Sequence, residues 1–124
     1  MKRFRKSLTL VFVTAIALYS ASALATEPPP LSCEMGPLTK SFGRTNWLVY
    51  ACDDGHSLVV VSGEGNPAIP FYFIFAWKDG AYQLHGEGTG DKKVTQAAFD
   101  ELSKLDKAGI EDLREEALKK GAKR

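Results

Sequence analysis

The residues with the clearest chemical potential stand side by side in the run Asp53-Asp54-Gly55-His56-Ser57. This run contains an acid, a base and a hydroxyl, the three residue types of a hydrolytic triad. If the chain is extended here, His56 and Ser57 point to opposite faces of a strand and cannot share a proton. We therefore interpret the run as a hairpin turn with polar flanks. A small secreted hydrolase or ligand-processing enzyme that uses Asp53 or His56 is the alternative.

A glycine-rich segment, residues 86–93, lies between an expected strand and an expected helix, where phosphate-binding loops occur. Its spacing differs from that of the Walker A motif, and the acidic side chain of Asp91 would repel a phosphate group. We interpret the segment as a flexible connector. A loop that recognises a partner is the alternative.

His85, Glu87 and Asp91 are close together in the sequence and carry groups that can hold a metal ion. Their spacing is not that of a calcium-binding loop, so we expect no metal and no cofactor. His85 is interpreted as a histidine on an exposed strand face. It is also the second histidine that the hydrolase alternative could use.

The chain has two cysteines, Cys33 and Cys52. In an oxidising compartment an isolated pair predicts one disulfide bond, and closing a loop of about 20 residues contributes about 3 kcal/mol to stability. The spacing is not the Cys-x-x-Cys of redox motifs, and two thiols are too few for a zinc site. We therefore predict a structural disulfide.

Residues 1–25 have the pattern of a secretory signal peptide. The first residues are basic, residues 8–18 are apolar, and Ala23-Leu24-Ala25 predicts cleavage after Ala25. The apolar part is about 11 residues long, shorter than the roughly 20 that span a bilayer. We expect a periplasmic or secreted protein without stable membrane insertion after cleavage. An uncleaved anchor and a lipoprotein are the alternatives.

The mature chain, residues 26–124, has 99 residues with 12 Lys or Arg and 15 Asp or Glu, a net charge of about −3. That length corresponds to one small domain. We expect a Pro- and Gly-rich leader and loop over residues 26–45 and a single α+β domain over residues 46–124. We expect no nucleic-acid partner, because such binding depends on neutralising phosphate charges.

Residues 70–77 form the densest apolar run of the mature chain and have the composition of a central strand. Asp54-Gly55 and Asp79-Gly80 each stand between β-rich runs and predict two-residue hairpin turns. The turns fix the register of the strands. They pair Tyr50 with Val59 in the first hairpin and Phe75 with Leu84 in the second. Four strands are expected, at 47–52, 57–62, 70–77 and 82–85.

Two amphipathic helices follow the strands. Thr95 is the expected N-cap of the first, with Val94 and Phe99 as its hydrophobic staple. The second contains Ile110 and Leu113. The order predicts an α+β fold, in which a four-stranded antiparallel β-meander with two Asp-Gly hairpins precedes two C-terminal helices packed on one sheet face.

The predicted register divides the side chains between two faces of the sheet. One face has the aromatic side chains of Phe73, Phe75 and Trp77, which the helices should bury. Two short helices cannot cover the second face as well, and an exposed apolar area of this size is typical of an interface. Cover by residues 31–44 is the alternative. The candidate binding residues of this second face are Tyr72, Ile74, Gln83 and His85.

The run from Val49 to Leu58, Val-Tyr-Ala-Cys-Asp-Asp-Gly-His-Ser-Leu, resembles the Tyr-x-Cys…Gly…Leu strand-turn-strand of periplasmic lysozyme inhibitors of the membrane-bound/periplasmic C-type group. The resemblance covers about ten residues and implies an exported inhibitor. Members of that group are small β-barrels, whereas this chain is expected to end in helices. Their Ser-Gly-rich inhibitory loop has no clear match in residues 86–91.

These observations predict a small exported, non-catalytic binding module, an inhibitor or an immunity-type protein that acts through a sheet face. Its partner is expected to be an envelope or extracellular protein, or a second copy of the chain. The two alternatives are the hydrolase described above and a structural homodimer that forms through the same face.

Overall fold

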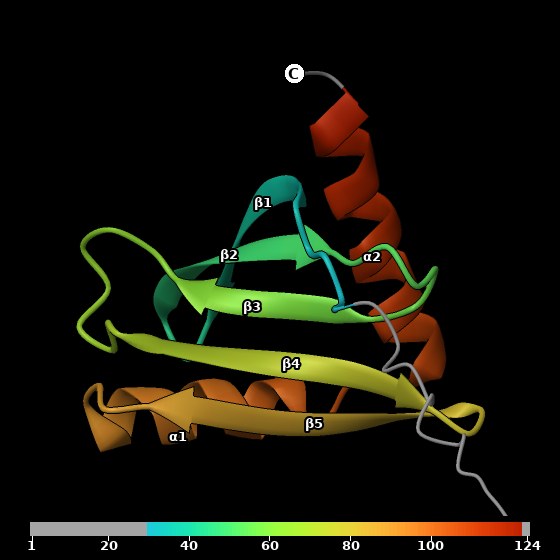
Figure 1. The fold of residues 1–124 in the computed structure, drawn as a ribbon. Helices are drawn as coiled ribbons and strands as arrows, with labels where there is room; N and C mark the ends of the chain where they lie inside the picture. Colours follow the sequence, from blue (N-terminus) through green and yellow to red (C-terminus); the bar gives the residue numbers. More distant parts are fainter. Residues whose placement is uncertain (1–29, 123–124) are drawn as a thin grey trace, which may run out of the picture. The chain divides into compact units, whose positions relative to one another are not determined.

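In the computed structural model, which describes residues 30–122, five strands are followed by two helices (Figure 1). The elements are β1 (Met35–Phe42), β2 (Thr45–Ala51), β3 (Leu58–Ser62), β4 (Phe71–Lys78), β5 (Ala81–Gly88), α1 (Lys92–Leu102) and α2 (Lys107–Ala122). The strands form one antiparallel sheet in the order β1-β2-β3-β4-β5. The predicted α+β class, the meander and the C-terminal helices are confirmed, but the sheet has five strands rather than four. The predicted signal peptide and its cleavage at Ala25 lie outside the described residues.

Strand β1 lies where the proline and glycines of residues 31–44 predict a loop, and that prediction is wrong. The strand pairs with β2, with Leu38 opposite Val49, after a shift of register beside Pro37. An edge strand tolerates a proline and a bulge, because its outer backbone groups have no ladder partner. Residue types that are typical of loops therefore occur at the start of this strand.

The β4–β5 hairpin has the predicted register, with Phe75 opposite Leu84. Its turn residues Asp79 and Gly80 have φ angles of 54° and 81°. A type I′ turn requires positive φ at both central residues. The Asp-Gly pair therefore fixes how these two strands align.

The β2–β3 hairpin also has the predicted register, with Tyr50 opposite Val59. Its turn is wider than the predicted two-residue loop. The Cys52 N–H donates to the Ser57 carbonyl over 2.9 Å and leaves four residues between them. The carboxylate of Asp54 organises this wider turn by accepting hydrogen bonds within it.

Helix α1 begins one turn earlier than predicted, because its N-cap is Asp91 and not Thr95. The Asp91 carboxylate accepts hydrogen bonds from the backbone N–H groups of Lys93 and Val94, at 2.9 and 3.2 Å. Thr95 is buried within the helix, and its hydroxyl donates to the Lys92 carbonyl.

Neither α1 nor α2, the helices of residues 30–122, has the length and apolar composition of a membrane-spanning helix.

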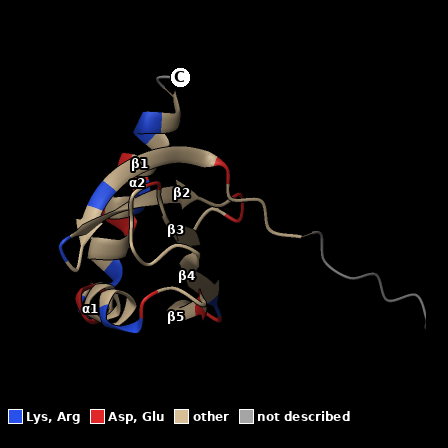
Figure 2. Cartoon of the chain, turned by 90° about the vertical axis from the view of Figure 1, so that its left-hand side faces the viewer, with Lys and Arg blue, Asp and Glu red and all other residues tan. Residues whose placement is uncertain are grey.

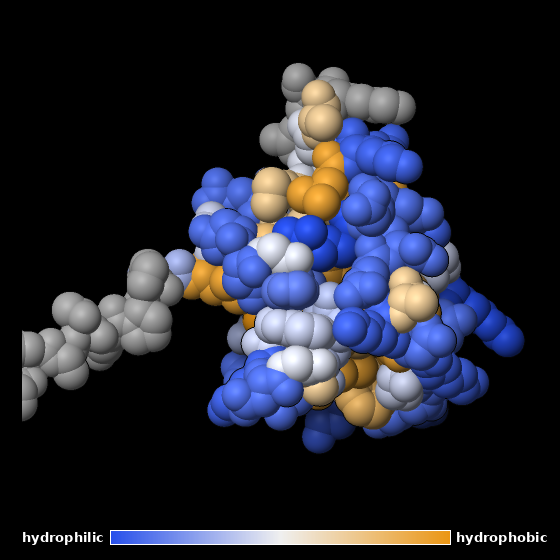
Figure 3. All heavy atoms as spheres, turned by 90° about the vertical axis from the view of Figure 1, so that its right-hand side faces the viewer, coloured by the Kyte–Doolittle hydropathy of each residue, from blue (hydrophilic) through white to orange (hydrophobic). Residues whose placement is uncertain are grey.

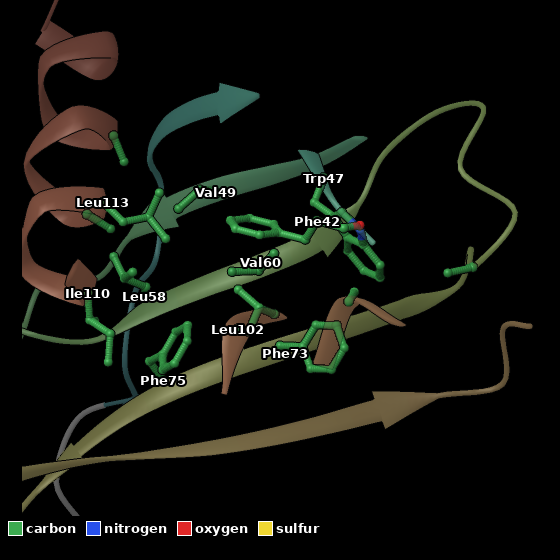
Figure 4. Close-up of a cluster of buried hydrophobic side chains, with 14 residues drawn as sticks. Phe42, Trp47, Val49, Leu58, Val60, Phe73, Phe75, Leu102, Ile110 and Leu113 are labelled. Carbon is green, nitrogen blue, oxygen red and sulfur yellow. The ribbon is translucent and has the colours of Figure 1, made fainter. Parts of the chain in front are cut away.

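The core lies between the sheet and the two helices, which both pack on the same side of the sheet (Figures 1 and 2). Side chains from α1 and α2 meet those of the strands in one cluster (Figure 4). Burying each large apolar side chain contributes about 1.5–3 kcal/mol. The predicted burial of Phe73 and Phe75 is confirmed, whereas Trp77, near the end of β4, is only half-buried. The largest side chains of the cluster with almost no exposure are Trp47, Phe73, Leu58, Leu102, Val49 and Val60.

The predicted disulfide between Cys33 and Cys52 is confirmed. Beside it, the Asp53 N–H donates to the Ser32 carbonyl over 2.8 Å, and the Ser32 N–H donates to the Asp53 carboxylate over 3.2 Å. These bonds fasten the chain before β1 to the β2–β3 turn. A disulfide in the fold is consistent with an oxidising, extracytoplasmic location.

Candidate functional site

The face of the sheet turned away from α1 and α2 has no helix of the described chain upon it (Figures 1 and 2). We call this surface the open sheet face. Its side chains come from alternate positions of the strands, and its middle is apolar. None of the apolar side chains there is fully buried. The members from β2 to β5 include Leu48, Tyr50, Val59, Val61, Tyr72, Ile74, Ala76, Gln83, His85 and Glu87.

The structure brings the four predicted site residues together on this open sheet face. Ile74 stands opposite His85, and Tyr72 is two positions away on the same strand. Tyr72 is 41% exposed, which is high for an aromatic side chain in a sheet. Gln83 and His85 are exposed, and Ile74 is half-buried. Of residues 31–44, the alternative cover, residues 35–42 extend the sheet sideways as β1 and do not cover this face. Ser32 and Cys33 are fastened to Asp53 and Cys52 at the β2–β3 turn.

At one end of the open sheet face lies a hollow of about 480 Å³, which we call the Tyr72 hollow. It is formed where β3 ends, β4 begins and β5 ends. Its walls are mainly apolar, and Ile69 on its rim is 53% exposed. Val61, Ile69, Pro70, Tyr72 and Glu87 are among the residues that line it.

Hydrogen bonds between two buried polar side chains and nearby backbone groups hold the walls of the Tyr72 hollow. The Ser62 hydroxyl donates to the Phe71 carbonyl and accepts from the Phe71 N–H, at 2.9 and 3.0 Å. The Asn66 side chain donates to the Asn46 carbonyl and accepts from the Ala68 N–H, at 2.8 and 2.7 Å. The loop between β3 and β4 is thereby fixed against the sheet. The hollow is preformed.

Glu87 lines the Tyr72 hollow but is not among the four candidate binding residues that the sequence predicts. It stands directly opposite Tyr72 in the β4–β5 ladder, whereas residues 86–93 are expected to be a flexible connector. Strand β5 continues to Gly88, so that expectation is wrong for its first three residues. The sequence does contain a signal for this pairing, because extending the hairpin register from Asp79-Gly80 pairs position 72 with position 87.

At the opposite end of the sheet, the Asp54 carboxylate contacts Ser57 directly, whereas a triad would place a histidine between the acid and the serine. The Ser57 hydroxyl donates to the Asp54 carboxylate over 2.5 Å and accepts from the Trp77 N–H over 3.0 Å. Burial alone would raise the pKa of the Asp54 carboxyl. Hydrogen bonds from Ser57 and from the His56 N–H, with the charge of His56, lower that pKa below its ordinary value. Ser57 is buried and fastens the turn to β4.

The imidazole of His56 is turned away from Ser57 and stacks on the Trp77 ring, with centroids 4.2 Å apart. Tyr82 packs against the same indole, and its hydroxyl donates to the His56 carbonyl over 3.1 Å. The Lys107 ammonium lies 5.4 Å from the centroid of the indole ring. The surface at this end is mostly hydrophilic (Figure 3). His56 is therefore part of an aromatic cluster that links the β2–β3 turn to the β4–β5 turn.

Burial, together with the Glu111 and Asp54 carboxylates, raises the pKa of the Tyr82 hydroxyl, and Arg114 opposes that rise. A tyrosine hydroxyl is protonated at neutral pH even at its ordinary pKa of about 10, and the Tyr82 hydroxyl donates within the cluster. Among residues 30–122 no group of three His, Cys, Asp or Glu side chains is placed to hold a metal ion. His85 and Asp91 belong to separate elements, β5 and the cap of α1.

Comparison of the chain with protein-family models, with curated proteins and with solved structures finds no match. The surface best suited to recognition combines the open sheet face with the Tyr72 hollow, since it joins exposed apolar area to a preformed cavity and one carboxylate.

Proposed function

We propose that this chain is a small exported binding protein, periplasmic or secreted, that holds a protein partner on the open sheet face without catalysing a reaction. The observation that supports this proposal is the apolar middle of the face and the Tyr72 hollow, which the described elements leave uncovered. Large apolar areas of this kind on soluble domains usually mark binding surfaces. In this proposal, the Tyr72 hollow holds a side chain of the partner.

The chemistry of the hollow specifies the side chains that the partner presents. The exposed ring of Tyr72 stands beside the Glu87 carboxylate, with Ile69 on the rim. An arginine fits this arrangement, because its guanidinium stacks on an aromatic face and pairs with a carboxylate. The mature chain has a net charge of about −3. That charge favours encounter with a basic partner.

The rigidity of the surface favours an inhibitor or an immunity-type protein. Ser62 and Asn66 hold the walls of the Tyr72 hollow before any partner arrives. A preformed surface loses little conformational entropy on binding, and this raises affinity. The strand-turn-strand that resembles periplasmic lysozyme inhibitors is formed by β2 and β3, which contribute the centre of the open sheet face.

Export is supported by two independent features. The N-terminal residues have the composition of a signal peptide, and the fold contains the Cys33–Cys52 disulfide. Disulfides of this structural kind are rare in reducing compartments.

The proposal is tested by capture with the immobilised mature chain from envelope extract and from culture medium. Tyr72→Asp places a charge in the hollow, and Met35→Asp is the matched control, since Met35 is 37% exposed on β1. We expect a discrete basic protein to be retained by the wild type and by Met35→Asp, and lost with Tyr72→Asp. Equal retention by all three proteins would contradict a role for the open sheet face.

A further inference from the structure

Strand β5 forms one edge of the sheet, and in the described part of the chain β4 is its only strand neighbour. Lys78 and Ala81 close the two-residue turn, and the pair that closes such a turn exchanges backbone hydrogen bonds. These pairs alternate along an antiparallel ladder. The backbone groups of Tyr82, Leu84 and Gly86 therefore point outward from the sheet.

The two edges of the sheet differ in how they are protected. The β1 edge contains Pro37, a register shift at its start, and Lys40, which pairs with Glu116 at 3.1 Å. Prolines, bulges and lysines are devices that discourage pairing with another chain. Strand β5 has no proline and no lysine, and its ladder with β4 is continuous from Ala81 to Gly88. Its edge is open to pairing.

The sequence of β5 is complementary to itself when two copies run antiparallel. On the side of the sheet that faces the helices, the two large side chains, Tyr82 and Leu84, precede two glycines, Gly86 and Gly88. Pairing centred on His85 sets each large side chain opposite a glycine of the other copy. On the other side, Gln83 stands opposite Glu87 and His85 stands opposite its own copy, so no two carboxylates meet.

A second hollow, which we call the Gly86 hollow, supports this register. It has a volume of about 190 Å³ and lies between Gly86 and α1, with Phe71, Phe73 and Phe99 among its walls. A Cβ at position 86 would stand 2.9 Å from a ring carbon of Phe73, so the site suits glycine. Leu84 of a second copy stands opposite Gly86 in this register and can pack into the hollow beside Phe99, which is 37% exposed.

We propose that two copies of this chain associate through antiparallel pairing of their β5 strands, centred on His85. Each copy contributes its five strands to one continuous sheet, and the contact is isologous, as in most homodimers. The two-fold axis is perpendicular to the sheet, so both open sheet faces lie on the same side. This dimer does not depend on the proposed partner, because it uses the edge of the sheet and not its face.

The first test is the mass of the mature chain in solution, measured by sedimentation equilibrium over a range of concentrations. His85→Lys sets two ammonium groups opposite each other, and Thr39→Lys adds the same charge at an exposed position of β1. We expect a dimer for the wild type and for Thr39→Lys, and at least a tenfold larger dissociation constant for His85→Lys. A wild type that stays monomeric, or a dimer that His85→Lys leaves unchanged, would overturn the proposal.

The second test examines the register. In the proposed pairing His85 faces its own copy across a pair without backbone hydrogen bonds, where Cβ atoms are about 4.5–5.5 Å apart. His85→Cys is therefore expected to give a disulfide-linked dimer under mild oxidation, and Thr39→Cys is expected to stay monomeric in a denaturing gel. Cross-linking through position 39 but not 85 would refute the β5 interface.

Discussion

At the scale of single residues, Asp54 explains why the β2–β3 turn keeps its register although the turn is wider than a two-residue loop. Its carboxylate accepts from the His56 N–H, the Ser57 N–H and the Ser57 hydroxyl. The hydroxyl in turn accepts from the Trp77 N–H, which joins the turn to β4. A run that contains the residue types of a triad thus has a structural role in the turn.

Replacing Asp54 with alanine removes these three hydrogen bonds. We expect the free energy of unfolding at pH 7 to fall by about 1–2 kcal/mol, since solvent weakens bonds to an exposed group. The pKa of this carboxyl is lowered in the fold. Its contribution is therefore complete above the unfolded-state pKa and is lost as the pH falls through the folded-state value.

Denaturant unfolding of both proteins from pH 7 downward measures this dependence. The difference between wild type and Asp54→Ala should shrink below about pH 4. Glu64→Ala is the control, because it removes the same charge from an exposed turn position. A difference that stays constant down to strongly acidic pH would show that the ionised carboxylate is not what stabilises the turn.

At the scale of elements, both hairpins could be predicted from the sequence, whereas strand β1 and the end of β5 could not. Asp79-Gly80 sets its register through local backbone chemistry, so the pairing of β4 with β5 follows without knowledge of the rest. Strand β1 was hidden by Gly36-Pro37, which an edge strand tolerates. Glu87 was hidden because glycines on both sides weaken the strand signal.

The Tyr72 hollow could not be predicted from the sequence for a different reason. Its loop is placed by the Asn66 side chain, which reaches the carbonyl of Asn46 on β2. The four predicted face residues were found because alternation along β4 and β5 is a local property. A contact between residues 20 positions apart in the sequence leaves no such pattern.

The turn between β1 and β2 is pressed against α1. Gly43 has a φ angle of 62°, and its N–H donates to the Glu101 carboxylate over 2.6 Å. A Cβ at this position would stand 2.6 Å from the Ala98 nitrogen and 2.9 Å from atoms of Ala97. The glycine is needed both for its backbone conformation and for this close approach.

Gly43→Ala is therefore expected to lower the free energy of unfolding by about 2–4 kcal/mol. Gly65→Ala is the matched control, because Gly65 has a φ angle of 81° and open space around its Cβ position. Gly65→Ala should lower the free energy of unfolding only by the backbone strain, about 1 kcal/mol. Equal losses in thermal or denaturant unfolding would mean that the contact between this turn and α1 adds nothing to stability.

At the scale of the whole molecule, one covalent bond fastens the chain before β1 to the sheet. The Cys33–Cys52 disulfide closes a loop across 19 positions and joins residues that lie before β1 and after β2. Replacing both cysteines with serine should lower the free energy of unfolding by about 3 kcal/mol. The mass of the oxidised, unfolded protein after thiol alkylation checks the premise, since an added alkyl group would show that the bond is not formed.

The candidate binding surfaces lie on different parts of the molecule. One side of the sheet is closed by α1 and α2, and the other is the open sheet face with the Tyr72 hollow at its end. The turn end that contains Asp54 and His56 is mostly hydrophilic (Figure 3). The proposed partner site and the proposed dimer edge adjoin each other along β5, so one dimer would present two partner sites on a common side.

Site-specific photo-cross-linking tests the proposed partner site most directly. A benzophenone amino acid replaces Tyr72 in one protein and Glu115, an exposed residue of α2, in another. Each is irradiated in the extract or medium that the capture experiment uses. The account predicts one discrete adduct with a basic protein from position 72, none from position 115, and loss of the adduct when Glu87→Lys is added. No adduct from position 72, or equal adducts from both positions, would contradict it.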